Sequence, residues 1–265
     1  MKTVSHTLRG VAAVLLLTGL ASAGGFQITG VGAEARGMSG AFRAIADDWT
    51  AAYYNPAGYA YIQDNYLGSN VAFVHYRNEL EPHYYAPGGF DQPYSWGHYN
   101  NRNIFNFHRI LDNPSAGLVI RTPFWGETVF GLSAYQTFDY NATWRLFDVP
   151  ASYDRSAQLR DEQYKNDFDV AAFQLTAGRE FIPDKLAIGV GLQLLRADLL
   201  FRDLTLRQNP LPSPYSDRNW DKIIELTSNE GYGWGFGARA GVLWRPTEKL
   251  HVGIVGAVPF NITID

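Results

Sequence analysis

The sequence predicts an all-β fold: an antiparallel β-barrel whose lumen holds an N-terminal helical plug. Three observations support this fold class. The chain begins with an export signal, its later segments alternate apolar residues with small or polar ones, and the connections between those segments are alternately short and long. Alternation with a period of two gives a strand one apolar face, and bacterial membrane barrels have short periplasmic turns and longer external loops.

The composition excludes several classes of protein. Of the 265 residues, 46% are hydrophobic, 15% aromatic and 18% charged, which is too apolar for a disordered chain. The formal net charge of -4 provides no basic surface, so we expect no nucleic-acid partner. The chain has no cysteine and therefore no disulfide framework. The mean hydropathy of -0.20 is typical of soluble proteins, but the two faces of barrel strands average out in this index.

The N-terminus has the features of a cleaved export signal. Lys2 and Arg9 flank an apolar run over residues 11–20, and Ala21-Ser22-Ala23 fits an A-x-A cleavage site. We therefore assign residues 1–23 to a signal peptide. The run is shorter than the about 20 apolar residues that a membrane-spanning helix needs, and no later stretch of the sequence qualifies. Any membrane-spanning part of the exported chain must then be a closed sheet.

Residues 25–59 form a stretch rich in Gly and Ala that precedes the first predicted strand. Its small side chains suit a segment that lies close against other backbone. We expect Asp47 and Asp48 to cap a short turn or helix, and Asn55-Pro56 to form a turn, because an asparagine before proline is held out of the α region. We interpret residues 24–60 as a plug of short helices and turns inside the barrel; a surface linker is the alternative. Residues 61–265 are then a partial transmembrane β-barrel.

Seven strands account for the alternating segments. Residues 186–194 place five apolar side chains on one face and Ala, Gly or Gln on the other, and residues 233–244 set Trp, Phe, Ala and Val against Gly and Arg239 in the same way. We interpret the apolar face as lipid-facing and the small face as lumenal. The predicted strands cover residues 66–77, 114–124, 128–144, 168–181, 185–202, 232–245 and 249–264.

Three motifs then resemble the N-terminal hatch of the FadL/TodX outer-membrane transporters: Gly25-Phe26-Gln27-Ile28, the run over residues 40–48, and Asn55-Pro56-Ala57. The resemblance implies a fourteen-stranded barrel, of which this chain holds about the first seven strands. It also implies hatch or gating roles for Phe26, Asp47, Asp48, Asn55, Pro56 and Ala57. We expect Asn55-Pro56-Ala57 to meet the barrel wall near the third predicted strand. Seven strands leave two open edges, which lipid does not tolerate, so we expect the chain to be the N-terminal part of a longer protein or a truncated gene model.

The resemblance implies outer-membrane transport of hydrophobic compounds, above all long-chain fatty acids. External loops would capture them, and they would leave the plugged, porin-like barrel sideways. We expect residues 219–229 to form an amphipathic loop helix with Trp220, Ile223 and Ile224 on its apolar side. This side would line an apolar capture groove or, alternatively, pack over the mouth of the barrel, and one helix could do both. Arg239 lies on the small-residue face of its strand, where it would bind a fatty-acid carboxylate or, alternatively, pair with the plug through Asp47 or Asp48.

The resemblance implies that the third predicted strand is the one that is kinked in the family, beside the lateral exit. Alternation in this strand is lost between Gln136 and Asn141. Phe138 and Tyr140 lie within that interruption and are therefore candidate substrate contacts.

No residue pattern indicates catalysis. Residues 235–240 match a dinucleotide-binding consensus, but their glycines alternate with bulkier residues as in a strand instead of opening a helix. We expect no enzyme activity, no cofactor and no metal site. The expected partners are hydrophobic small molecules, outer-membrane lipid and lipopolysaccharide, with the protein acting as a monomer in the bacterial outer membrane. The alternative function is a structural or adhesive outer-membrane barrel without transport.

Overall fold

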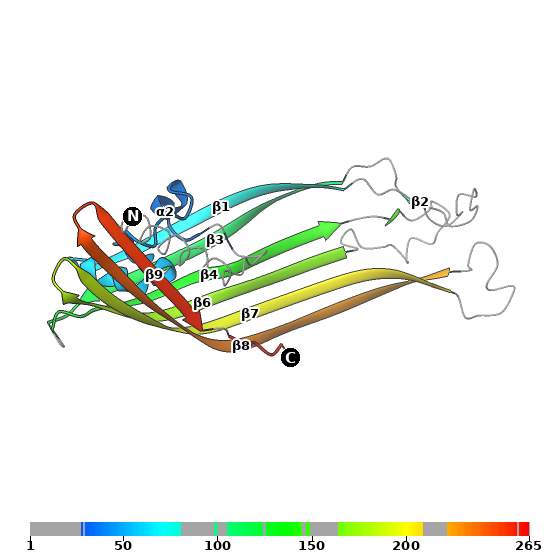
Figure 1. Cartoon of the computed structure of the whole chain (residues 1–265). Helices are drawn as coiled ribbons and strands as arrows, with labels where there is room; N and C mark the ends of the chain where they lie inside the picture. Colours follow the sequence, from blue (N-terminus) through cyan, green and yellow to red (C-terminus); the bar gives the residue numbers. More distant parts are fainter. Residues whose placement is uncertain are drawn as a thin grey trace, which may run out of the picture.

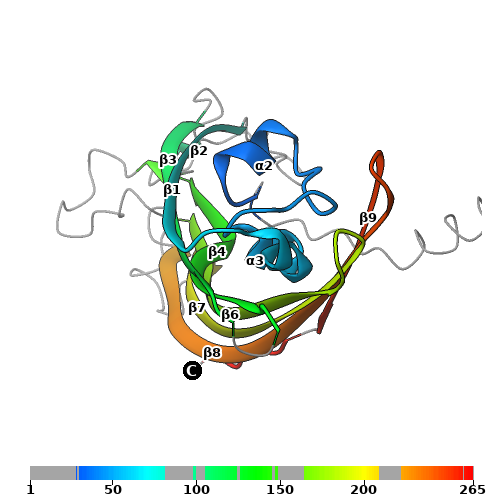
Figure 2. The same ribbon diagram turned by 90° about the vertical axis from the view of Figure 1, so that its left-hand side faces the viewer.

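The fold is a seven-stranded antiparallel sheet that curves around an N-terminal segment (Figures 1 and 2). The computed structural model describes residues 28, 30–80, 98–99, 105–123, 126–144, 147–148, 164–208, 222–258 and 260–264. Neighbouring strands follow the order of the sequence: β1 (Tyr66–Leu80), β3 (Phe105–Arg121), β4 (Val129–Trp144), β6 (Tyr164–Ile182), β7 (Leu186–Gln208), β8 (Lys222–Thr247) and β9 (Leu250–Val258). Two further strands of two residues each, β2 (His98–Tyr99) and β5 (Phe147–Asp148), pair with each other.

The sequence located all seven strands of this sheet, but it placed several ends too close to the short turns. β3 begins at Phe105, not at residue 114, and β8 begins at Lys222, not at residue 232. The β7–β8 hairpin shows why, because its pairing continues without a register shift from Leu186 opposite Trp244 to Gln208 opposite Lys222. β9 differs in the other direction and ends at Val258, before the predicted residue 264.

The amphipathic helix predicted over residues 219–229 is wrong. Residues 222–229 belong to β8 and pair with the last part of β7. A short run of apolar residues at mixed spacing fits either a helix or a strand, and here β-branched residues and an available partner strand favour the strand. Ile223 and Ile224 therefore lie in strand β8 and not on one side of a helix, as was predicted. Trp220 lies outside the described residues.

The two faces of the sheet differ in the way that the alternation predicts. On the convex face Leu192 is 63% exposed and Phe236 is 80% exposed, whereas Leu195 and Leu243 on the concave face are completely buried. Exposed apolar side chains on the outside of a curved sheet suit contact with lipid. The concave face is the lumenal face.

Residues 30–62, which we call the plug segment, lie in the concavity of the sheet (Figure 2). The plug segment contains α2 (Ala33–Gly37), α3 (Ala51–Tyr54) and the 3-10 helix η1 (Pro56–Tyr61). We call the seven-stranded sheet the wall. Phe42 and Tyr59 of the plug segment are completely buried in one apolar cluster with wall residues such as Val119 and Leu195. No helix in the described part of the chain has the length and apolar character that a membrane span requires.

Candidate functional site

Asn55 fastens the plug segment to the wall. It follows α3 and precedes η1, and its side-chain oxygen accepts a hydrogen bond from Ala57 N at 3.1 Å, which caps η1. Its side-chain nitrogen donates to the carbonyl oxygens of Arg43 at 2.9 Å and Val242 at 3.2 Å, and Val242 belongs to β8. Asn55 is completely buried, so its side chain holds a strand, a turn and a helix together away from water.

The Asn55-Pro56-Ala57 box contacts the wall at β7 and β8, so the predicted contact near the third strand of the sheet, β4, is wrong. A side chain at Gly241 would collide with the Asn55 oxygen, and a side chain at Gly189 would collide with the backbone of Pro56 and Ala57. These two glycines lie directly opposite each other in the β7–β8 register. Gly178 of β6 lies opposite Gly189 and also approaches the Pro56 backbone. The box is located there because adjacent glycines leave room for backbone at the wall.

Trp49 fastens the other side of the plug segment to β1 and β3. Its indole ring lies over Gly68 of β1 and Gly117 of β3, a second pair of glycines that lie directly opposite each other on adjacent strands. The backbone N–H of Trp49 donates to the Tyr66 hydroxyl at 2.5 Å. Asp48 shapes the preceding turn, since its carboxylate accepts a hydrogen bond from Thr50 N at 2.8 Å.

Asp47 lies next to Asp48 and within reach of Arg245, whose guanidinium stacks over the Tyr61 ring at 3.6 Å from its centroid. Asp47 is exposed as a whole, but partial desolvation of its carboxyl, and then the charge of Asp48, raise the pKa of Asp47 above its ordinary value. A hydrogen bond to the backbone and the charge of Arg245 act in the opposite direction and are weaker. The charged form of Asp47 is therefore disfavoured in the folded protein.

A buried polar cluster joins the plug segment to β4, β6 and β7. Gln174 of β6 donates to the Ala52 carbonyl oxygen at 2.9 Å, and Tyr135 of β4 donates to the Gln174 side-chain oxygen. Gln193 of β7 donates to the Tyr135 hydroxyl at 2.8 Å and to the Gln174 oxygen at 3.0 Å. The loss of one partner would leave buried groups unsatisfied at about 1–3 kcal/mol each. The polar cluster therefore favours a single position of the plug segment.

Arg239 lies on the lumenal face, as its strand parity predicts, and contacts the plug segment. Its Nη1 donates to the Tyr53 carbonyl oxygen, and its guanidinium lies 5.1 Å from the centroid of the Tyr53 ring. The Tyr53 ring in turn meets the Tyr135 ring edge-on at 5.4 Å. The plug group that Arg239 holds is thus a backbone carbonyl and an aromatic face, not the carboxylate of Asp47 or Asp48 that the sequence suggested.

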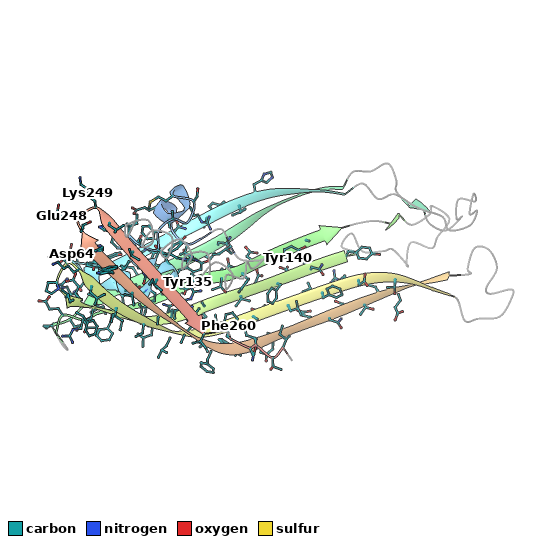
Figure 3. The ribbon with its side chains drawn as sticks, in the orientation of Figure 1. Asp64, Tyr135, Tyr140, Glu248, Lys249 and Phe260 are labelled. Atoms are coloured by element: carbon teal, nitrogen blue, oxygen red, sulfur yellow. The ribbon has the colours of Figure 1, made fainter. Side chains whose placement is uncertain are left out.

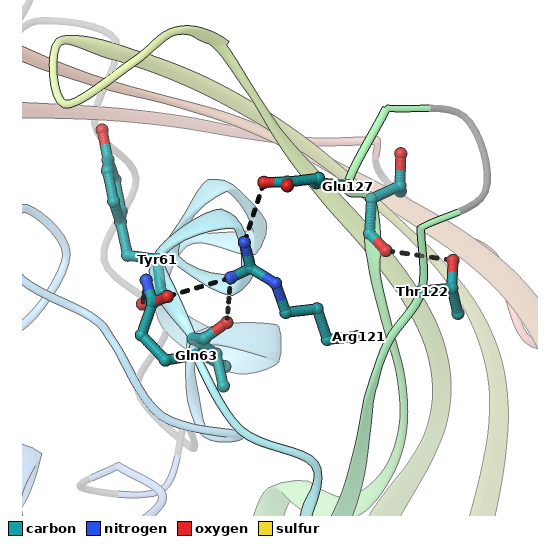
Figure 4. A network of polar contacts seen from close by, with 7 residues as sticks. Tyr61, Gln63, Arg121, Thr122 and Glu127 are labelled. Carbon is teal, nitrogen blue, oxygen red and sulfur yellow. Dashed lines mark hydrogen bonds and ion pairs between the residues drawn. The ribbon is translucent and has the colours of Figure 1, made fainter.

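Arg121 ties the end of the plug segment to the turn between β3 and β4 (Figure 4). Its Nη1 donates to the Ile62 carbonyl oxygen at 3.1 Å and to Gln63 Oε1 at 3.2 Å, and its Nη2 pairs with Glu127 at 2.9 Å. Glu127 is exposed, so this ion pair adds little stability. It orients the chain where the plug segment leads into β1.

β4 carries a β-bulge at Thr137. Ala171 and Val170 are consecutive on β6, but their partners on β4 are Gln136 and Phe138, which leaves Thr137 as an extra residue. The loss of alternation after Gln136 in the third predicted strand therefore coincides with a β-bulge in the structure. The Thr137 carbonyl oxygen accepts a hydrogen bond from Ile28 N at 3.3 Å, just before the plug segment, and Thr137 Oγ1 donates to the Val170 carbonyl oxygen at 3.0 Å.

The bulge turns Phe138 toward the lumen. Residues 135 and 138 of a regular strand face opposite sides, yet Tyr135 pairs with Ala172 and Phe138 pairs with Val170, two buried lumenal residues of β6. The ring centroids of Phe138 and Phe168 are 6.5 Å apart. Five partly buried apolar side chains pack against the lumenal core on this level, and we call them the upper apolar cluster: Ile28, Phe138, Phe168, Phe260 and Ile262.

The predicted site residues fall into three groups. Asn55, Pro56 and Ala57 meet at the β7–β8 glycines, and Arg239 lies further along β8. Tyr135 and Tyr140 follow each other along β4 away from the short turns (Figure 3), and Tyr140 is 37% exposed. Phe26 and Trp220 lie outside the described residues.

Sequence reasoning missed the polar cluster and the role of Trp49. One signal was present: Gln174 and Gln193 are polar residues on strand faces that otherwise carry small side chains. A large polar side chain on such a face has only the lumen to point into.

Comparison with known proteins identifies the fold. Residues 14–256 match the family described as "Outer membrane protein transport protein (OMPP1/FadL/TodX)". The chain belongs to this family. No curated protein matches it. The FadL/TodX family consists of outer-membrane proteins, so the apolar convex face of this chain is the face that meets lipid.

Two solved structures are similar to this FadL/TodX-family chain. One is the crystal structure of a Pseudomonas aeruginosa FadL homologue, with a TM-score of 0.58 and 17% identity, covering 91% of this chain and 56% of that one. The other is the CymD monoaromatic hydrocarbon channel, with a TM-score of 0.57 and 16% identity, covering 89% and 55%. At these identities the likeness shows the fold alone, and the chain spans little more than half the length of either structure.

Proposed function

We propose that the full-length protein transports hydrophobic compounds, chiefly long-chain fatty acids, across the outer membrane by a path that leaves the barrel at the bulge of β4. The observation that carries the proposal is the hydrogen bond from Ile28 N to the Thr137 carbonyl oxygen, beside Phe138. It brings the chain just before the plug segment, an irregular stretch of wall and an apolar lumenal surface to one place.

The physical argument is that an apolar ligand needs a dry path. Each Å² of apolar surface removed from water contributes about 25 cal/mol, and a water-filled pore supplies none of it. The upper apolar cluster provides such a surface, whereas the polar cluster and the plug segment lie next to it on the side nearer the short turns. A bulge leaves one residue outside the strand ladder, so fewer hydrogen bonds oppose a sideways opening there.

Arg239 favours a ligand with a carboxylate over a plain hydrocarbon. Its guanidinium donates to the Tyr53 carbonyl of the plug segment, which carries no charge. A carboxylate would add an opposite charge and could accept two parallel N–H···O bonds from the same guanidinium. A fatty acid that reached this level would compete with the plug for Arg239. We propose gating roles for Asp47, Asp48, Asn55, Pro56 and Ala57 on the same basis, because they hold the plug against the wall.

Uptake assays with the full-length protein test the path and the ligand together. Deletion of Thr137 restores regular pairing of β4 with β6, so we expect uptake of radiolabelled oleate to fall about tenfold at an unchanged level of protein in the outer membrane. Deletion of Gly126, in the turn before β4, shortens the same hairpin without touching the bulge and serves as the control. Normal oleate uptake after deletion of Thr137 would exclude the lateral path, and uptake of toluene without oleate would reassign the substrate to hydrocarbons.

A further inference from the structure

A groove runs along β8 on the convex face, near the short turns. It consists of two successive hollows of about 380 Å³ and 470 Å³. We call it the outer groove. Its floor is formed by Val242, Ala240 and Ala238 of β8 and Gly256 of β9, and its walls by Leu186, Val190, Leu192, Val252, Ile254 and Val258.

The strand register explains why the wall is hollow there. Ala240 lies between Val190 of β7 and Gly256 of β9, and the next row toward the long connections places Ala238 between Leu192 and Val258. The small residues Ala238, Ala240 and Gly256, bordered by Val190, Leu192 and Val258, make a channel parallel to the strand. At Gly256 no atom lies within 4 Å of the place where a side chain would start, so the channel is open to the outside.

The length of the outer groove matches one leaflet of the membrane. From Trp244 to Ala238 the strand advances by about 20 Å at about 3.3 Å per residue. With a strand tilt of about 40° this distance covers about 15 Å of depth, which is half of a hydrocarbon core of about 30 Å. The groove starts at the short-turn end, which is the periplasmic end in bacterial barrels.

The positively charged side chain of Lys185 lies at the periplasmic end of the groove. Lys185 is exposed and lines the first hollow, and it has no ion-pair partner in the described part of the chain. Trp244, which is 51% exposed, lies in the same hollow. Tryptophan and lysine at this depth are typical of the boundary between lipid tails and head groups.

We propose that the outer groove binds one phospholipid of the periplasmic leaflet, with an acyl chain along Ala238, Ala240 and Gly256 and its phosphate against Lys185. The apolar walls exclude the head group from the groove, and the charge of Lys185 selects a phosphate for its end. This site needs only the position of the chain in the outer membrane and does not depend on the proposed transport.

Native mass spectrometry of the full-length protein, purified in detergent and washed free of loosely held lipid, tests the site. We expect one phospholipid on the wild type and about tenfold lower occupancy in A240L/G256L, whose leucines fill the groove. The matched control is A116L/A134L, because Ala116 and Ala134 also face each other on the convex side of the sheet. It should keep the lipid of the wild type.

A second pair of variants tests the head group. K185Q should lower the retention of phosphatidylglycerol severalfold and K185R should restore it, whereas K249Q, at another exposed lysine of the short-turn end (Figure 3), should have no effect. Equal occupancy in A240L/G256L and the wild type would show that the lipid belongs to a nonspecific shell and would overturn the proposal. A retained mass of a free fatty acid in place of a phospholipid would overturn it as well.

Discussion

Facing glycines determine how the plug fits the wall. Gly189 opposite Gly241 admits the Asn55-Pro56 backbone, and Gly68 opposite Gly117 admits the Trp49 ring. One glycine alone would leave the side chain of its cross-strand partner in the way, since directly opposite side chains lie about 5 Å apart. Facing glycines therefore clear a space at least two strands wide, and Gly178 of β6, opposite Gly189, extends the first of the two spaces to a third strand.

A methyl group at Gly189 should loosen this fit. Its Cβ would lie 2.2 Å from the Pro56 carbonyl carbon and 2.3 Å from Ala57 N, and both are backbone atoms that cannot rotate away. We expect Gly189→Ala to lower the free energy of unfolding by about 1–3 kcal/mol, as overpacking does in other cores. Urea unfolding of the full-length protein in detergent, followed by tryptophan fluorescence, measures it. Gly37→Ala is the control, because nothing lies within 4 Å of that position; equal losses in both variants would contradict the argument.

Asp47 should make stability depend on pH. Its pKa is raised on folding, so the folded state holds the proton more tightly, and stability falls as the pH rises from the unfolded value of 3.8 through the raised one. At a pH above the raised pKa, the charged carboxylate of Asp47 lowers the free energy of unfolding. We expect Asp47→Asn to unfold at a higher urea concentration than the wild type at pH 7 and at the same concentration near pH 3. A variant less stable than the wild type at pH 7 would show that the charge stabilises the plug.

At the scale of elements, period-two alternation predicted which segments form the sheet but not where the strands end at the long connections. Every strand of the sheet and the assignment of its faces follow from it, because each face meets one uniform environment. The helix predicted over residues 219–229 failed because a short run does not separate the two periods. The lumenal position of Phe138 could not be predicted, because it depends on which residue of β6 lies opposite the bulge.

The plug segment was predicted as an element, but its location on the wall was not. Its contacts join Asn55 to Val242 and Ala52 to Gln174, which are far apart in the sequence. No local pattern records such a pairing. The polar cluster has the same origin, since Tyr135, Gln174 and Gln193 come from three different strands.

Removal of the plug segment should open the barrel. The strands pair with one another and not through the plug, so we expect the full-length protein without residues 30–62 to reach the outer membrane and to conduct ions in planar bilayers. The double variant Asn55→Ala/Pro56→Ala keeps the segment and its Arg239 contact but removes the hydrogen bond from Asn55 to Val242 of β8, and it should show brief openings. If the deletion variant conducted no more than the wild type, the plug would not be what closes the lumen.

At the scale of the whole molecule, the described lumen has three levels. The level nearest the short turns holds the Asn55-Pro56-Ala57 box and the ion pair of Arg121 with Glu127. The polar cluster and Arg239 form the next level, and the upper apolar cluster lies beyond them. A ligand that enters between the long connections meets apolar surface first and buried polar bonds afterwards. This order is consistent with the sideways exit that we propose, because straight passage would break the middle level and leave several buried groups unsatisfied.

The direction of the two outer strands limits how the sheet can close. β1 and β9 both ascend from the short-turn end, since seven strands that alternate in direction must begin and end alike. Joined directly, these edges would form a parallel seam, and two upright copies side by side would form two such seams. An antiparallel seam on both sides requires an odd number of intervening strands. Seven plus any odd number is even, which agrees with the even strand counts of bacterial single-chain barrels.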